Sequence, residues 1–188
     1  MIFVALLRGI NVGGKNKVDM KKLKLTFEGI GATDVVTYIN TGNIIFRDDA
    51  RSVQQLSEQL EAAIAVDFGL TIRVMVRTMD EIKRIMDKLP EHWTNDTDMK
   101  SDVLYLWDEI NEEAVLEKLI INAEVDRVSY VDGAVFWSYD RADADKSGMN
   151  KMATSKKVFQ QMTVRNVNTA RKIYELMQAA EQKQLTKG

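Results

Sequence analysis

The 188-residue sequence contains no cysteine, one proline and one histidine. Without cysteine there can be no disulfide, no thiolate catalysis and no cysteine-based metal site, which fits a reducing compartment such as the cytoplasm. The single histidine, His92, lies in a polar segment, and no Ser-His-Asp arrangement can be assigned. We therefore expect a cytoplasmic protein with no metal and no cofactor, and no catalytic residue can be named.

Long apolar runs are also absent. The first seven residues, Met1 to Leu7, are apolar, but Arg8 and Gly9 end the run. It is too short for the hydrophobic region of a signal peptide and far too short to span a bilayer. We interpret it as a buried strand and expect no association with a membrane.

Charge is distributed unevenly along the chain. Residues 1–24 carry six Lys or Arg against one acidic residue, and residues 146–188 carry nine against two, which leaves 11 basic and 25 acidic residues between them. The two basic ends could form one surface that attracts anions. Alternatively, they are lysine-rich helix surfaces facing solvent, which is the more ordinary explanation. The sequence leaves both interpretations open.

The first half has the element order βαββαβ, which is typical of a ferredoxin-like fold. Asp19 is a predicted N-cap, and Ser52 with Gln55 forms a predicted capping box. The predicted strands are residues 2–7, 35–39, 44–46 and 71–77. The first predicted helix covers residues 20–30, and the second begins at Val53 and is ended by Gly69.

The second half repeats this order after a polar linker at residues 91–99. Thr78 and Glu81 begin a helix that ends at Pro90, Asn111 is a predicted helix cap, and Asp132-Gly133 is a predicted hairpin turn. The remaining predicted elements are strands at 103–107, 125–131, 134–138 and 163–165 and helices at 149–161 and 166–182. We predict an α/β (α+β) protein of two ferredoxin-like halves packed together, residues 1–90 and 100–188, with an extra C-terminal helix.

A glycine- and asparagine-rich loop, Arg8 to Asn16, follows the first strand. In a ferredoxin-like sheet this loop lies at the same edge as the turn between the second and third strands, Asn40 to Asn43. The fourth strand begins at that edge, which brings Arg73 nearby. Glycines let backbone N–H groups approach a ligand, and successive N–H groups form an anion-binding nest. The sequence therefore predicts an anion site with two walls.

The loop nearly matches the P-loop pattern G-x-x-x-x-G-K-[ST]. However, Asn16 stands where a Ser or Thr hydroxyl would hold Mg²⁺, and the following helix begins later, near Asp19. A true P-loop is thus disfavoured, and a generic phosphate or carboxylate site is the better hypothesis. The alternative is a tight loop whose glycines and asparagines serve only the backbone.

A second polar cluster, Thr163 to Thr169, opens the last predicted helix. Asn166 or Thr163 is expected to cap that helix. A cation at a helix N-terminus is disfavoured, so Arg165 is expected to have an acidic partner or an anionic ligand.

These motifs resemble those of a bacterial family known as domain of unknown function 1697. The segments that carry the resemblance are Leu6–Asn16, Met20 with Leu23, Thr37–Asn43, Val76–Thr78 and Thr163–Thr169. The family often has Ser where Thr41 stands and an aromatic residue where Val167 stands. The resemblance implies a ferredoxin-like α/β fold but no established activity, so no catalytic residue can be transferred.

We expect a protein that binds a phosphorylated or otherwise anionic small molecule or nucleotide, and we leave open whether it is an enzyme. The expected binding residues are Arg8, Asn11, Gly13, Gly14, Lys15, Thr41, Gly42, Asn43, Arg165 and Asn168. The alternative is a nucleic-acid or protein interaction module that uses the basic ends, and of these a nucleic-acid partner is not favoured. The oligomeric state cannot be read from the sequence.

Overall fold

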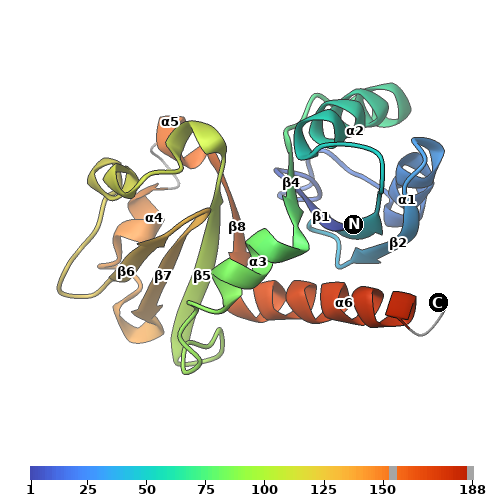
Figure 1. Ribbon diagram of the computed structural model, residues 1–188. Coiled ribbons are helices and arrows are strands. Elements are labelled where there is room, and N and C mark those ends of the chain that lie inside the picture. The colour runs from blue at the N-terminus through green and yellow to red at the C-terminus, as the bar shows by residue number, and fades with distance from the viewer. Residues whose placement is uncertain (153–155, 186–188) are drawn as a thin grey trace. The chain divides into compact units, whose positions relative to one another are not determined.

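The computed structural model describes residues 1–152 and 156–185 (Figure 1). The chain forms two compact units: Met1–Ile82 together with the chain from Ile173 onward, and Lys83–Lys172. No helix in the described part of the chain is both long and apolar enough to cross a membrane.

The first unit contains one four-stranded sheet in the order β2-β3-β1-β4. All neighbouring strands are antiparallel, as the ferredoxin-like order requires. The elements are β1 (Ile2–Leu7), α1 (Met20–Gly29), β2 (Thr33–Tyr38), β3 (Asn43–Arg47), α2 (Val53–Phe68) and β4 (Val74–Thr78). The predicted order of elements is confirmed, although β4 begins at Val74 rather than at Thr71.

Local signals set the helix boundaries of this unit. The Asp19 side chain accepts a hydrogen bond from Lys22 N at 2.8 Å, so it caps α1 as predicted. Ser52 and Gln55 make the predicted capping box at the start of α2, which ends at Gly69 in the left-handed conformation (φ 66°). These caps need only residues close in sequence, which is why they could be predicted.

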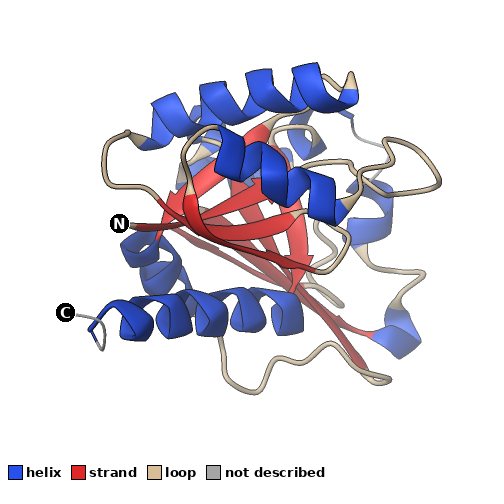
Figure 2. Cartoon of the chain, turned by 90° about the vertical axis from the view of Figure 1, so that its right-hand side faces the viewer, coloured by secondary structure: helices blue, strands red, loops and turns tan. Residues whose placement is uncertain are grey.

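Helices α1 and α2 cover one face of the sheet (Figure 2). The Phe46 ring lies at the centre of this core, 5.7 Å from the Phe3 ring and 5.4 Å from the Phe27 ring. Leu23 and Leu60 are fully buried against the same sheet face. Burying each such side chain stabilises the fold by about 1.5–3 kcal/mol, so the sheet is a firm base for the loops at its edge.

The second unit has the same sheet order, β6-β7-β5-β8, again antiparallel throughout. Its strands are β5 (Met99–Leu106), β6 (Arg127–Val131), β7 (Ala134–Asp140) and β8 (Met162–Asn166), and α3 (Met79–Met86) precedes them. The predicted hairpin turn at Asp132-Gly133 is confirmed, with Gly133 at φ 92°. The mixed α/β fold class with two ferredoxin-like sheets is therefore confirmed.

The helix predicted after Asn111 is wrong. Two 3₁₀ segments, η1 (Asp108–Ile110) and η2 (Glu113–Lys118), occupy this region. The Asn111 side chain does not cap a helix, because its oxygen accepts hydrogen bonds from Gly133 N at 2.8 Å and from the Tyr130 hydroxyl at 3.1 Å. A contact with a hairpin distant in sequence has replaced the local cap.

The predicted helix at 149–161 corresponds to two short helices, α4 (Gly148–Met152) and α5 (Lys156–Phe159), after the 3₁₀ segment η3 (Arg141–Asp143). Residues 153–155 lie outside the described part of the chain.

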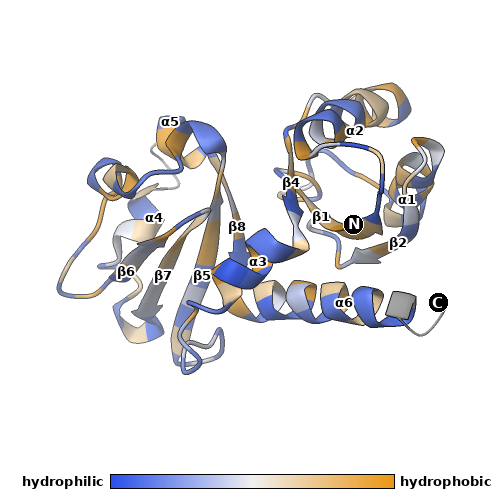
Figure 3. Cartoon of the chain, in the orientation of Figure 1, coloured by the Kyte–Doolittle hydropathy of each residue, from blue (hydrophilic) through white to orange (hydrophobic). Residues whose placement is uncertain are grey.

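The C-terminal helix α6 (Val167–Leu185) contributes its residues from Ile173 onward to the first unit. There, Arg47 Nη2 donates to the Ala180 carbonyl oxygen at 3.5 Å. Hydrophobic and hydrophilic residues alternate along α6 (Figure 3), as expected of a helix with one buried face.

A buried carboxylate organises the loop before α4. Asp126 accepts hydrogen bonds from Trp137 Nε1 at 3.0 Å, Asn122 N at 2.9 Å and Gly148 N at 2.8 Å. A Cβ atom at Gly148 would lie 1.7 Å from the Ile120 carbonyl oxygen, so no side chain fits there.

We expect Gly148→Ala to lower the free energy of unfolding by about 3 kcal/mol, because backbone atoms cannot move away from the added methyl group. Gly29→Ala is the matched control: no atom lies within 4 Å of its added Cβ, so stability should stay the same or rise slightly. Urea denaturation of both variants measures the difference. Equal stability of the two variants would contradict the packing at Gly148.

Candidate functional site

The loop after β1 is a small hairpin. Val12 and Lys15 form an isolated β-bridge, with Lys15 N donating to the Val12 carbonyl oxygen at 3.1 Å. The two residues between them, Gly13 (φ 58°) and Gly14 (φ 75°), are both left-handed. This is the geometry of a type I′ turn, which favours glycine at both positions. The Gly-Gly pair thus forms an exposed hairpin tip rather than the start of a helix.

Two asparagines hold this hairpin in shape, and both are left-handed themselves, Asn11 at φ 52° and Asn16 at φ 49°. The Asn11 side chain accepts from Val18 N at 2.8 Å and donates to the Val18 carbonyl at 3.0 Å and the Asn40 carbonyl at 2.8 Å. Asn16 Nδ2 donates to the Gly9 carbonyl oxygen at 2.9 Å. Asn11 therefore ties the hairpin to the turn between β2 and β3.

That turn lies directly against the loop, as the strand topology predicted. Leu7 N donates to the Gly42 carbonyl oxygen at 2.9 Å. Gly42 has φ 81°, and a Cβ there would lie 2.7 Å from Leu7 Cβ and 2.9 Å from Ile10 Cδ1. Asn43, fully buried, donates to the Tyr38 carbonyl at 3.0 Å and to Thr41 Oγ1 at 3.1 Å. Only a residue without a side chain allows this approach of the two loops.

Several cations surround the paired loops. Arg8 N donates to the Arg73 carbonyl oxygen at 3.4 Å, so the two arginines stand at the ends of adjoining strand segments. Burial and, secondly, the positive charge of Arg73 lower the pKa of Arg8. Lys15 and Lys17 are exposed on the hairpin. Four basic residues, Arg8, Lys15, Lys17 and Arg73, therefore lie on or next to this loop.

Ile39 was not predicted as a site residue, yet it is a backbone outlier beside the site. It has φ 49° and an exposed fraction of 45%. A left-handed conformation is strained for a β-branched residue and is sparsely populated. Ile39 immediately precedes Asn40, whose carbonyl accepts the Asn11 hydrogen bond. The sequence did not indicate this left-handed conformation, because isoleucine is a common residue in strand-like segments.

The comparisons with known proteins agree with the family resemblance. The family model described as "Protein of unknown function (DUF1697)" matches residues 1–137. The chain belongs to this family. The structure is also similar to that of the conserved bacterial protein SP0830 from Streptococcus pneumoniae, with 28% sequence identity and a TM-score of 0.80. That match covers 94% of this chain and 98% of the other. No curated protein matches the chain.

The polar cluster Thr163 to Thr169, which was also expected to contribute, lies in the second unit. Arg165 is 7% exposed, and its Nη1 donates to Thr163 Oγ1 at 3.0 Å and the Val164 carbonyl at 2.8 Å. Burial lowers the pKa of Arg165 to about 10, while the nearby Tyr105 acts in the opposite direction. The exposed Asn168 donates to the Asn95 carbonyl at 2.9 Å. Asn166 accepts from Thr169 N at 3.0 Å and so caps α6, as expected of one residue in this cluster.

The two units of this DUF1697 protein share a local motif that was not predicted from the sequence. Val76-Arg77-Thr78 ends β4, and Val164-Arg165-Asn166 ends β8. Arg77 Nη1, like Arg165 Nη1, donates to the preceding carbonyl oxygen, at 3.3 Å. Thr78 then caps the next helix by accepting from Glu81 N at 3.2 Å. Aligning the two strand ends by their arginines would have revealed the repeat.

No group of three or more His, Asp or Glu side chains is positioned to hold a metal ion within residues 1–152 and 156–185. The loop edge carries backbone amides of the hairpin tip, the Thr41 hydroxyl group and the basic side chains of Arg8, Lys15 and Lys17.

The close packing at Gly42 predicts a difference between two glycine substitutions. Gly42→Ala should lower the free energy of unfolding by about 3 kcal/mol. The added methyl group would press on Leu7 and Ile10, and the backbone of residue 42 would also keep a left-handed conformation that alanine disfavours. Gly13→Ala should cost about 1 kcal/mol, because it is left-handed but has open space around its Cβ. Denaturant unfolding of both variants is the measurement, and equal costs would refute the packing.

Proposed function

We propose that the loop of residues 8–16 and the turn of residues 40–43 form a binding site for a phosphorylated or otherwise anionic small molecule, nucleotides included. The observation that carries this proposal is the pair Arg8 and Arg73 beside the Gly-Gly hairpin. Burial and, secondly, repulsion by the positive charge of Arg73 lower the pKa of Arg8. A bound anion would relieve that repulsion and could accept bidentate hydrogen bonds.

The proposed binding residues have different tasks. Arg8 and Lys15 would supply positive charge, and Thr41 would supply a hydroxyl group. Gly13 and Gly14 would let a phosphate approach the backbone N–H groups of the hairpin tip, because no side chain shields them. Asn11 and Gly42 hold the two loops together, and Asn43 shapes the turn by donating to Thr41 Oγ1.

Arg165 and Asn168, which the sequence also suggested as binding residues, belong to the second unit, and the proposed site is built from first-unit residues. The hydrogen bonds of Arg165 to Thr163 and Val164 give it a structural role in its own unit. The Asn168 side chain fastens the linker at Asn95. The affinity for an anion is therefore expected to depend chiefly on the first-unit residues.

We expect ATP or inorganic phosphate to raise the free energy of unfolding by about 2–3 kcal/mol at a hundredfold excess over its Kd. Arg8→Gln, Arg73→Gln and Lys15→Gln should each weaken that affinity about tenfold, since each removes one charge-assisted contact. Isothermal titration calorimetry measures the affinities.

Lys24→Gln is the matched control for these variants. It removes the same charge from the same unit, but the Lys24 ammonium lies along α1, 3.7 Å from Glu28. Its anion affinity should stay within about twofold of the parent. The proposal fails if no anion stabilises the protein, or if Lys24→Gln weakens binding as much as Arg8→Gln does. Binding of a single-stranded oligonucleotide with a steep salt dependence and no binding of ATP would instead support a nucleic-acid partner.

A further inference from the structure

A second concave region lies in the first unit, away from the loop residues just described. It is a cavity of about 480 Å³ between α1, β2, the end of β3 and α6 from Leu176 onward. Small-molecule sites in proteins have volumes of about 300–1,000 Å³, so the cavity is large enough for a ligand. Its lining includes none of residues 8–16 or 40–43.

Part of the lining of this cavity is apolar. Val36, on the edge strand β2, leaves 40% of its surface exposed, and Leu176 and Ala180 of α6 line the same space. Ala179 also lines it, so two successive positions of α6 carry only a methyl group there. Larger side chains at these positions would fill the cavity. An apolar part of a ligand could cover Val36 and lose contact with water.

The cavity lining contains equal numbers of basic and acidic side chains. Three cations and three carboxylates line the cavity: Lys24, Arg47, Lys183, Glu28, Asp34 and Asp49. A lining of this composition does not favour a purely anionic or a purely cationic ligand. Its charge complementarity favours a molecule that carries one charge of each sign.

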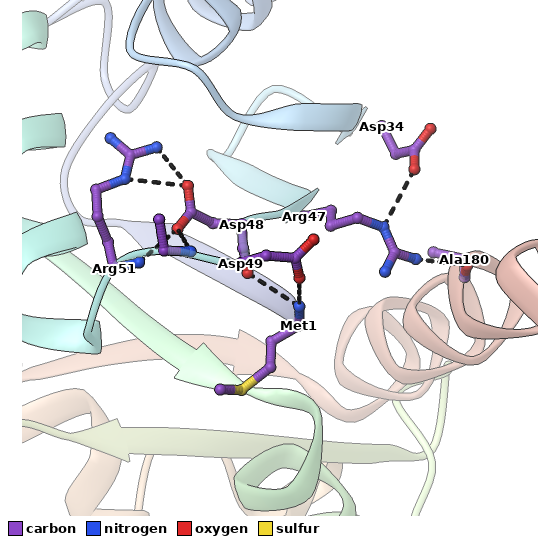
Figure 4. Close-up of polar contacts among 8 residues, drawn as sticks. Met1, Asp34, Arg47, Asp48, Asp49, Arg51 and Ala180 are labelled. Carbon is purple, nitrogen blue, oxygen red and sulfur yellow. Dashed lines mark hydrogen bonds and ion pairs between the residues drawn. The ribbon is translucent and has the colours of Figure 1, made fainter.

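Among the charged residues of the lining that form a described ion pair, Arg47 has the least exposed side chain, at 12%. Its Nε donates to Asp34 Oδ2 at 3.3 Å and its Nη2 to the Ala180 carbonyl at 3.5 Å (Figure 4). Both hydrogen bonds are long for charge-assisted contacts, which are usually about 2.7–2.9 Å. A ligand carboxylate at this guanidinium could make shorter and stronger bonds.

The β2 wall of the cavity is irregular at Asp34. This residue is left-handed (φ 51°), and the pairing of β2 with β3 shifts register between Thr33 and Val36. Such β-bulges redirect side chains and are frequent beside functional sites. The Asp34 carboxylate is 62% exposed, so it can accept a hydrogen bond from a ligand ammonium group while it remains near Arg47.

We propose that this cavity binds a zwitterionic ligand with an apolar body, namely an α-amino acid or a short peptide. Arg47 binds the ligand carboxylate, Asp34 binds the ammonium group, and the apolar side chain lies on Val36 and Leu176. This site is separate from the anion site at the loops and differs from it in the charge that it selects.

Calorimetric titration with L-leucine and L-leucyl-L-leucine tests the proposal. N-acetyl-L-leucine and L-leucinamide are the matched probes, because each lacks one of the two charges of leucine. We expect at least one zwitterion to bind, and each singly charged probe to bind about tenfold or more weakly than leucine. If neither zwitterion binds, or if a singly charged probe binds as tightly as leucine, the proposal is wrong.

Two variants locate the binding. Val36→Phe fills the cavity and should abolish zwitterion binding, whereas Val66→Phe makes the same change at a position on α2 that is 84% exposed and outside the cavity. Asp34→Asn keeps the volume but removes the carboxylate, so it should weaken zwitterion binding about tenfold. ATP affinity at the loops should be unchanged in both cavity variants, which separates this site from the loop site. Unaltered zwitterion binding in Val36→Phe and Asp34→Asn would show that the ligand binds elsewhere and overturn the proposal.

Discussion

The carboxamide of Asn11 is the contact on which the loop edge of the first unit depends. Its three hydrogen bonds join the hairpin to Val18, directly before the α1 cap, and to Asn40 in the β2–β3 turn. Replacing the carboxamide would leave buried or half-buried backbone groups without partners, which costs more than the bonds themselves contribute. One side chain thereby fixes the position of the glycine tip relative to Gly42, and the cations on the hairpin are fixed with it.

Local patterns in the sequence were enough to predict most of the first unit. The caps at Asp19 and Ser52 and the turn at Asn40 to Asn43 involve residues within a few positions of each other, so their chemistry can be read directly. Topology then predicted that the two loops meet, because a helical connection makes β1 and β2 parallel and brings their ends to one edge. The Leu7–Gly42 hydrogen bond confirms that step.

Features that depend on distant contacts could not be predicted in the same way. Asn111 has the residue type of a helix cap, but its side chain is bound to the hairpin at Gly133, and 3₁₀ turns replace the helix. The cavity beside Val36 exists because residues from Leu176 onward lie near the first sheet, which periodicity within α6 cannot indicate. The left-handed backbone at Ile39 and Asp34 could not be predicted either, because neither residue type requires that conformation.

The two units share strand order and even the Val-Arg-cap motif at β4 and β8, yet their first strands lead into different structures. β1 continues into a Gly-Gly hairpin held by asparagines, whereas β5 continues into the 3₁₀ segment η1. Both units therefore have a ferredoxin-like sheet, but the Gly-Gly hairpin follows the first strand of the first unit and not that of the second. Since a binding site depends on the loops that a scaffold carries, the repetition of the fold does not imply a repetition of function. Leu106 N donates to the left-handed Gly133 as Leu7 N does to Gly42, but no left-handed glycine follows β5 directly among the described residues. The anion chemistry is therefore proposed for the edge that carries the Gly-Gly hairpin.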